Sequence, residues 1–302
     1  MRFSVWPNTD VSFHALAATV VESERLGYYA AYLPDHLMPH GDAEALRGDT
    51  LESTVSLAAL AAMTSTIRLG ILVAAATFRH PALYAKSLCT IDQISRGRTI
   101  AGIGAGWQEN EHASYGIRLG PTAERIDRFE EYVRVLASLL TNETTSFAGD
   151  YYQLRDAPCD PRPVQSPMPL LVGVRGRRRT MGIAARHATV WNAWSTPEVL
   201  AELNGVLDEW CFRVGRPPQD VERSVNTGLF LSDDEHQLAR WREQPSGGPT
   251  LIGNPEQVAE LIERYRATRC DELILAFDTD ETSRHLEMLA MFMEQVVPLL
   301  PA

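Results

Sequence analysis

The sequence predicts one (β/α)8 barrel of the TIM type, spanning residues 1–302. Short apolar runs that suit buried parallel strands alternate with longer segments whose apolar residues recur at helical spacing. About eight such pairs follow one another, which is the number that closes a barrel. No linker divides the chain, and a 45% hydrophobic composition suits one large core. We therefore expect a single α/β domain with one insertion, around residues 141–168.

The strands that this pattern predicts are short and mostly apolar. They cover Arg2–Trp6, Ala30–Leu33, Arg68–Ala75, Thr99–Ile103, Leu170–Val174, Ala188–Trp194, Val225–Leu231 and Glu272–Phe277. Helices are predicted between them: the first ends at Gly27, another begins at Pro255, and the last covers Ser283–Leu300. The insertion holds a hairpin, with strands Thr144–Phe147 and Tyr151–Leu154, and a proline-rich connector.

Composition excludes several classes of function. A formal charge of −11 argues against nonspecific nucleic-acid binding, which needs a basic face. The only lysine is Lys86, so Schiff-base chemistry is not expected. Four cysteines far apart in sequence and scattered histidines predict neither a disulfide framework nor a metal site. Because no apolar run is long enough to span a membrane and no targeting segment is evident, we expect a cytoplasmic protein.

In such a barrel the working residues follow the carboxyl ends of the strands. This rule selects Asn8 after the first strand, Asp35 and His36 after the second, and Thr77 and Arg79 after the third. It also selects Gly104 to Glu111, Gly173 to Arg179 and Asn192 to Ser195 after the next three strands. Arg98 lies instead at the start of a strand, and we expect it to pair with Asp92 in a structural role.

The glycines after the fourth strand raise the question of a nucleotide loop. Gly102, Gly104 and Gly106 alternate with other residues, but the later third glycine of a dinucleotide-binding loop is missing. The Lys-Ser/Thr pair of a P-loop is absent as well. The segment is therefore expected to form part of the barrel mouth.

Several short motifs occur in the same order along nearly the whole chain. They are Pro34-Asp35-His36, Phe78-Arg79-His80-Pro81, Ile94-Ser95-x-Gly97-Arg98, the run from Gly102 to Glu111, Leu170-Leu-Val-Gly173, Ala184-Ala-Arg186 and Trp191-Asn192. In these motifs the chain resembles the bacterial-luciferase-like superfamily of flavin and deazaflavin oxidoreductases. Within it, the chain looks most like the branch that uses coenzyme F420, a deazaflavin that carries hydride.

The resemblance implies roles for named residues. His36, with Asp35, would be catalytic: a neutral imidazole can hydrogen-bond the ring carbonyl and exchange a substrate proton. Substrate would contact Trp6, Asn8, Trp107, Glu111 and Trp194. The cofactor would contact Asp35, Leu72, Val73, Ala75, Thr77, Gly104, Ala105, Gly106, Asn110, Gly173, Val174, Arg175, Gly176 and Arg177. The bulge that supports the ring in this family often has a cis peptide bond, here Leu72–Val73.

The segment Gly173–Thr180 departs most from the family pattern. Relatives usually carry more glycines there, whose backbone N–H groups hold the cofactor phosphate at a helix start. This chain has four arginines instead, which are unfavourable at a helix N-terminus unless an anion is present. They could bind a phosphate and an acidic tail. The same departure leaves open a weakened or lost cofactor site.

Three functions therefore remain open. The first is an F420-dependent oxidoreductase acting on a small organic substrate. The second is an FMN-dependent monooxygenase that receives reduced flavin from a partner reductase and uses dioxygen. The third is a cofactor-free barrel that acts as a binding protein. By analogy with the family, we also expect a homodimer. Specificity is expected to come from the loops at Pro39–Thr50, Thr141–Met168 and Leu231–Thr250.

Overall fold

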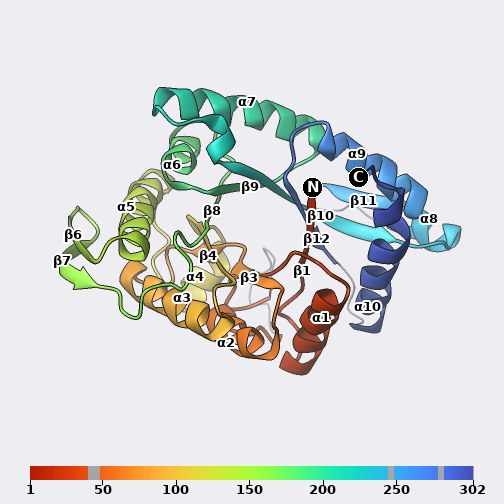
Figure 1. Ribbon diagram of the computed structural model, residues 1–302, viewed down its shortest axis with the longest axis horizontal. Helices are drawn as coiled ribbons and strands as arrows, with labels where there is room; N and C mark the ends of the chain where they lie inside the picture. The colour runs from red at the N-terminus through yellow and green to blue at the C-terminus, as the bar shows by residue number, and fades with distance from the viewer. Residues whose placement is uncertain (40–47, 244–247, 278–281, 302) are drawn as a thin grey trace.

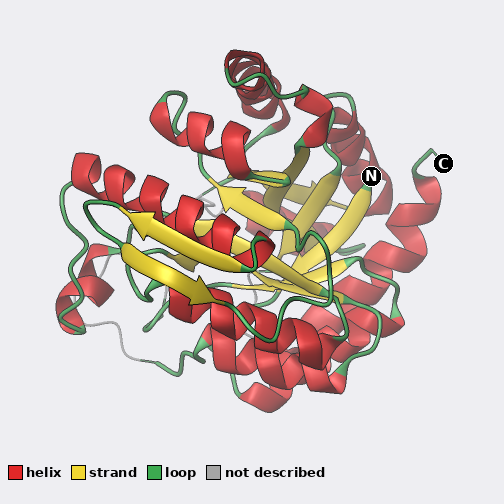
Figure 2. Ribbon diagram, turned by 60° about the vertical axis from the view of Figure 1, so that its left-hand side comes forward, coloured by secondary structure: helices red, strands yellow, loops and turns green. Residues whose placement is uncertain are grey.

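Eight parallel strands close into a barrel that a ring of helices surrounds (Figures 1 and 2). The computed structural model describes residues 1–39, 48–243, 248–277 and 282–301. In order around the barrel, the strands are β1 (Arg2–Trp6), β2 (Ala30–Leu33), β3 (Arg68–Ile71), β5 (Thr99–Gly104), β8 (Leu170–Gly173), β9 (Val190–Trp194), β10 (Glu222–Leu231) and β12 (Glu272–Ala276). Pairing of β12 with both β10 and β1 completes the closure. The predicted fold class is confirmed.

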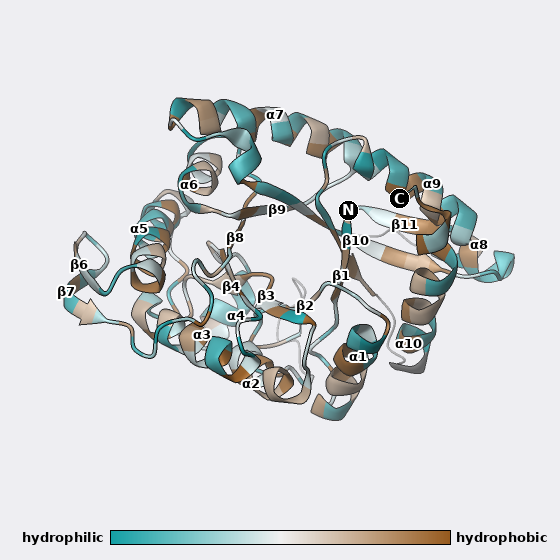
Figure 3. Cartoon of the chain, viewed as in Figure 1, coloured by the Kyte–Doolittle hydropathy of each residue, from teal (hydrophilic) through white to brown (hydrophobic). Residues whose placement is uncertain are grey.

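Most of the helices that follow the strands form the outer layer. They are α1 (Phe13–Arg25), α2 (Ser53–Met63), α3 (Pro81–Ser95), α5 (Thr122–Thr141), α6 (Arg179–His187), α7 (Pro197–Arg213), α8 (Glu235–Glu243), α9 (Pro255–Arg266) and α10 (Thr282–Met291). The short helix α4 (Glu109–Ser114) lies inside this ring (Figure 1). Figure 3 shows hydrophilic segments interleaved with hydrophobic ones along these helices, as expected where one face packs on the strands. Among the described residues, no helix is both long and apolar enough to cross a bilayer.

Three predicted elements differ from the structure. The expected strand Arg68–Ala75 is broken, because β3 ends at Ile71 and the two-residue β4 (Ala74–Ala75) pairs separately with β5. The predicted last helix is not continuous: after α10 come a π-helical turn (Phe292–Val296) and a 3-10 turn (Val297–Leu299) that contains Pro298. The segment predicted as a loop up to Thr250 contains α8, and β11 (Thr250–Gly253) then adds to β10.

The insertion is a two-stranded hairpin outside the barrel. Strands β6 (Thr144–Ala148) and β7 (Gln153–Pro158) pair antiparallel and lie beside α5 at the edge of the molecule (Figure 1). The connector that follows runs along α3 before it enters β8. Asp92 on α3 accepts hydrogen bonds from the backbone N–H groups of Val164 and Gln165 at 2.8 and 3.2 Å. The structure therefore confirms a hairpin followed by a connector, but the second strand begins at Gln153 and continues to Pro158, whereas the sequence predicted Tyr151–Leu154.

Polar groups at the amino-terminal end of the strands bond to one another. Buried Arg98 donates to the carbonyl oxygens of Ala61, Thr64 and Ile67 at 2.9, 2.9 and 2.5 Å. The prediction that Arg98 pairs with Asp92 is wrong, because the carboxylate of Asp92 instead accepts from the connector and from Thr99 N. Both residues are structural, as expected, but each secures different backbone segments.

Glu272 lies at the same end, inside the barrel, and is almost completely buried. Its Oε1 atom accepts hydrogen bonds from the hydroxyls of Ser4 and Tyr32 at 2.6 and 3.0 Å. Burial raises the pKa of the Glu272 carboxyl above its usual value of 4.5. Above this layer, Tyr32, Leu72, Ile100, Leu171, Val190 and Ile274 form an apolar cluster that fills the barrel. The base of the barrel is therefore a packed core.

Candidate active site

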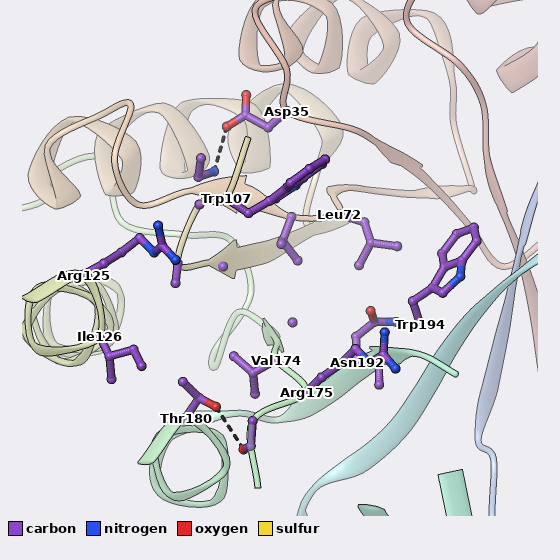
Figure 4. A pocket seen from close by; sticks show the side chains of 18 of the residues that line it. Asp35, Leu72, Trp107, Arg125, Ile126, Val174, Arg175, Thr180, Asn192 and Trp194 are labelled. Carbon is purple, nitrogen blue, oxygen red and sulfur yellow. Dashed lines mark hydrogen bonds between the residues drawn. The ribbon is translucent and has the colours of Figure 1, made fainter. Parts of the chain in front are cut away.

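A cavity of about 770 Å³ opens at the carboxyl ends of the strands. This volume is sufficient for a drug-sized ligand or a cofactor ring with its side chain. Figure 4 shows the cavity bordered by residues from the strand ends, α5 and the loop after β8. Its lining consists of Trp6, Asp35, His36, Leu72, Val73, Ala75, Gly104, Ala105, Gly106, Trp107, Glu111, Thr122, Arg125, Ile126, Gly173, Val174, Arg175, Gly176, Arg177, Arg178, Arg179, Thr180, Asn192, Ala193, Trp194 and Asn226.

One wall of the cavity is the bulge between β3 and β4. The Leu72–Val73 peptide bond is cis, as the family resemblance led us to expect. The glycines of the neighbouring strands make room for this bulge. A Cβ atom on Gly104 would come 2.4 Å from Val73 Cγ2, and one on Gly173 would come 2.8 Å from Val73 Cγ1. The side chain of Val73 therefore fills part of the space that these two glycines leave, and Val73 lies at the cavity surface.

His36 and Glu111 form a hydrogen-bonded pair at the cavity wall. Nδ1 of His36 lies 3.0 Å from Oε1 of Glu111, and the N–H of Leu37 donates to Oε2 at 2.9 Å. The Glu111 side chain is 2% exposed and that of His36 is 14% exposed, so the pair is shielded from bulk solvent. When the carboxylate is ionised it accepts from Nδ1–H, so Nε2 carries the lone pair of the neutral ring. An imidazole held in this way can act as a general acid or base.

Asp35 holds the adjacent loop in place. Both of its carboxylate oxygens accept from the guanidinium of Arg79, at 2.6 and 2.9 Å. Oδ2 also accepts from Ala75 N at 2.9 Å, the bond drawn at Asp35 in Figure 4. Burial lowers the pKa of Arg79, but the carboxylates of Asp35 and Glu52 outweigh this effect and raise it. Arg79 therefore stays charged, and Asp35 ties the end of β2 to β4 and the start of α3.

Arginines gather on the opposite side of the cavity, around the start of α6. Arg177 pairs with Glu202 at 2.6 Å, and Arg179 pairs with Asp127. No ion pair is formed by Arg125, Arg175 or Arg178 with an acidic residue in the described parts of the chain. Figure 4 shows Arg125 reaching the cavity from α5 and Arg175 from the loop after β8. The positive end of the α6 dipole adds to these charges, so the arrangement suits an anion.

Two indole rings and amide side chains border the remaining side. Trp6 at the end of β1 and Trp194 at the end of β9 make an edge contact, with ring centroids 5.6 Å apart. Asn226 on β10 is aligned in register with Trp194, and Asn192 donates to the hydroxyl of Ser224 at 3.0 Å. Gly248 packs against the Trp194 ring, since a Cβ there would come 1.7 Å from Nε1. This side can hold an uncharged part of a ligand.

Most of the predicted site residues line this cavity, but three do not. Asn8 is exposed and accepts from Asp10 N at 3.0 Å in a local turn. Thr77 is buried beneath the wall, with Oγ1 2.8 Å from Nε2 of His112. Asn110 accepts from Glu111 N at 2.8 Å at the start of α4. The predicted contacts of these three residues with a ligand stay predictions. Of the predicted loop at Pro39–Thr50, residues 40–47 lie outside the described part of the chain.

Other lining residues were not predicted from the sequence. Thr122, Arg125 and Ile126 lie at the start of α5, which reaches the mouth because helices begin near the carboxyl ends of preceding strands. A search of helix starts as well as strand ends could have found them. Asn226 lies within the long strand β10. Its position could not be found from the sequence, since the predicted strand continues for five further residues to Leu231.

The family model described as luciferase-like monooxygenase matches residues 1–250. The chain belongs to this family. It is therefore an enzyme of the oxidoreductase class. A curated relative from Kineococcus radiotolerans, named F420-dependent glucose-6-phosphate dehydrogenase, is 36% identical over 319 aligned positions, covering 94% of this chain and 92% of the relative.

Solved structures of the luciferase-like fold superpose on nearly the whole chain. The coenzyme F420-dependent tetrahydromethanopterin reductase of Methanopyrus kandleri has a TM-score of 0.82 at 17% identity, with 99% of each chain covered. The EDTA monooxygenase of Chelativorans sp. BNC1 also has a TM-score of 0.82, at 15% identity, with 99% of this chain and 93% of that chain covered. Since identity is this low, these similarities establish the shared fold and do not identify the reaction.

Proposed function

We propose that this enzyme is an F420-dependent oxidoreductase that moves a hydride between the deazaflavin and a small organic substrate. The observation that carries the proposal is the surplus of positive charge at the cavity. Arg125, Arg175 and Arg178 lack an acidic partner among the described residues, beside a helix start that itself favours an anion. F420 carries a phosphate and a further acidic tail, whereas FMN carries the phosphate alone. The named activity of the Kineococcus relative supports the same choice.

The described residues fit such a group. The cavity has room for a ring at the Val73 bulge and an anion site at the start of α6, joined by the small residues Gly104, Ala105, Gly173 and Gly176. When bound, the deazaflavin would supply the hydride carrier. The chain would orient it between the bulge and the loop Gly173–Thr180. Residues Ala75, Gly106, Val174 and Arg177, which also line the cavity, would complete the cofactor contacts.

The His36–Glu111 pair would handle the proton that accompanies hydride transfer. Hydride removal from an alcohol carbon requires that its hydroxyl proton leave, and the reverse reaction requires that a proton be supplied. Nε2 of His36 is the atom that we assign to this exchange, with Glu111 stabilising the protonated ring through Nδ1. Asp35 would act as a positioning residue, because Arg79 and Ala75 N already occupy its oxygens.

The indoles of Trp6, Trp107 and Trp194 would then form walls of the substrate pocket. The ring of Trp107 makes an edge contact with His36, with centroids 5.8 Å apart, so a substrate near His36 would also lie near Trp107. Aromatic walls exclude water from the reacting atoms and favour an uncharged reacting group.

The alternative is an FMN-dependent monooxygenase served by a partner reductase. Its support is the description of the matching family and the fold shared with the EDTA monooxygenase. The third expectation, a cofactor-free binding protein, is not carried further, because the chain belongs to a family of oxidoreductases. Homodimer formation and a cytoplasmic location stay predictions.

A reaction assay separates these functions. The enzyme would be incubated with F420 and a panel of small alcohols and sugars, and reduction of F420 would be followed by its absorbance. A parallel reaction would supply reduced FMN and a substrate panel and measure oxygen consumption above the uncoupled background. We expect F420 turnover. Substrate-dependent oxygen consumption with FMN, and no F420 turnover, would overturn the proposal in favour of the monooxygenase.

A further inference from the structure

The fold brings together two cysteines that are 70 positions apart. Sγ of Cys89 on α3 lies 3.5 Å from Sγ of Cys159, the first residue after β7. Both side chains are buried, and neither belongs to the cavity lining. The spacing of these cysteines in the sequence does not indicate the contact, because Cys89 belongs to a barrel helix and Cys159 to the insertion. The other two cysteines, Cys211 and Cys270, form no such contact with a second sulfur in the described parts of the chain.

Contacts on both sides of the pair hold the two segments together. One turn before Cys89, Lys86 Nζ donates to the carbonyl oxygen of Asp160. One turn after it, Gln93 Nε2 donates to the carbonyl oxygen of Arg162 at 2.7 Å. Asp92 accepts from Val164 N and Gln165 N. The backbones on either side are therefore docked already, and the sulfur atoms need to move closer by only about 1.5 Å to reach bonding distance.

We propose that Cys89 and Cys159 form an oxidisable thiol pair that a peroxide converts into a disulfide joining α3 to the connector. In the first step the Cys159 thiolate attacks a peroxide oxygen, the O–O bond breaks, and a sulfenic acid and, after protonation, water are formed. In the second step the sulfur of Cys89 attacks that sulfenic sulfur, the S–O bond breaks, and a second water leaves. The two sulfur atoms together supply the two electrons that reduce the peroxide.

The local environment identifies Cys159 as the first nucleophile. The hydrogen bond from the Cys89 thiol lowers the pKa of Cys159 below its ordinary value, and the positive charges of Lys86 and Arg162 act in the same direction. Burial instead raises the pKa of Cys211, and that of Cys270 to about 12. Cys159 also lies close to the surface, since its neighbours Pro158 and Asp160 are exposed. A small local opening is therefore enough to admit a peroxide.

The bond would close a loop that contains β5, α4, α5 and the hairpin. Such a crosslink restricts the unfolded chain and is expected to raise the Tm by several degrees relative to the reduced protein. The connector would also become more resistant to proteolysis, because it could no longer detach from α3. The cavity residues do not take part, so the proposal does not depend on the cofactor.

The test treats the purified full-length protein with graded hydrogen peroxide and then alkylates free thiols under denaturing, non-reducing conditions. Peptide mass spectrometry is expected to find the Cys89 and Cys159 peptides joined, with two hydrogens lost, while Cys211 and Cys270 remain alkylated. Dithiothreitol should reverse the crosslink and the rise in Tm. Protein that stays folded but shows only separate thiols, or separate sulfinic acids, at Cys89 and Cys159 would overturn the proposal.

Matched variants complete the experiment. Cys89→Ser and Cys159→Ser should each abolish the crosslinked peptide and the rise in Tm, whereas Cys211→Ser should retain both. In the Cys89→Ser variant, peroxide should still convert Cys159 into a sulfenic acid that reacts with a sulfenic-acid probe. This result would identify Cys159 as the first residue to be oxidised. A crosslink that persists in either single variant, or a rise in Tm without Cys159, would contradict the assignment.

Discussion

The two ends of the barrel contrast in how their charged groups are partnered. At the amino-terminal end, buried Arg98 donates to four backbone carbonyl oxygens, and Glu272 accepts hydrogen bonds from two hydroxyls. At the carboxyl end, Arg125, Arg175 and Arg178 have no acidic partner in the described residues and border a cavity of about 770 Å³. Groups satisfied within the chain contribute to stability, whereas unpartnered charges around a cavity are available to a ligand.

The largest expected effect is on catalysis, at the mouth. His36→Ala removes the proposed proton-exchange group, and we expect kcat to fall about 100- to 10,000-fold, the range typical of general acid–base catalysis. Cofactor affinity should change little, because Asp35 and Arg79 still hold the loop. Steady-state kinetics at saturating substrate measure the effect, with the exposed His14→Ala as the control. An unchanged kcat would remove His36 from the mechanism.

The next effect is on stability, at the base. Arg98→Met leaves several buried carbonyl oxygens without their donor, and we expect the free energy of unfolding to fall by about 2–4 kcal/mol. Arg25→Met, which breaks only an exposed pair with Glu22, should change it by less than about 1 kcal/mol. Urea denaturation of both variants measures the difference. Equal losses of unfolding free energy in the two variants would show that the buried hydrogen bonds of Arg98 stabilise the fold no more than an exposed ion pair does.

A smaller effect is expected on cofactor affinity when one positive charge is removed from the barrel mouth. Arg175→Ala removes one unpartnered cation at the mouth and should weaken F420 binding about tenfold, without changing the Tm. Arg213→Ala, on the exposed surface of α7 and paired with Glu209, should leave affinity unchanged. Fluorescence titration at low and high salt checks both variants. An affinity loss as large in Arg213→Ala would mean that only the overall charge of the protein matters.

The smallest effect concerns the pH dependence of stability. Because the folded-state pKa of Glu272 is raised by burial, the folded protein keeps a proton that the unfolded chain loses as pH rises above 4.5. Stability therefore decreases with rising pH through this window. Glu272→Gln should remove that decrease and keep the hydrogen bonds from Ser4 and Tyr32. Thermal denaturation across this pH range gives the measurement, and a variant with the same slope as the unchanged protein would contradict the assignment.

The sequence predicted features that depend on local patterns, but not contacts between residues that lie far apart in the chain. Strand ends are local patterns, so His36, Glu111 and Trp194 were placed correctly at the mouth. The pairing of Arg98 with Asp92 was wrong, because each side chain bonds backbone groups distant in sequence. The contact of Cys89 with Cys159 depends on how the insertion docks on α3. Sequence periodicity contains no information on such docking.

Family motifs and apolar periodicity differ in how specific they are as sequence signals. The mouth motifs identified the family, which the match over residues 1–250 confirmed. The break between β3 and β4 was not visible in the apolar run Arg68–Ala75, although the resemblance placed a cis bond at Leu72–Val73. Family motifs therefore predicted which residues line the cavity more closely than periodicity predicted the bounds of the strands that carry them.

The central claim is that the unpartnered arginines at the mouth select F420. Calorimetric titration of the protein with F420 and with FMN tests it most directly. We predict that F420 binds at least about tenfold more tightly than FMN, and that the difference shrinks as salt screens the acidic tail. Equal or tighter binding of FMN would contradict the claim.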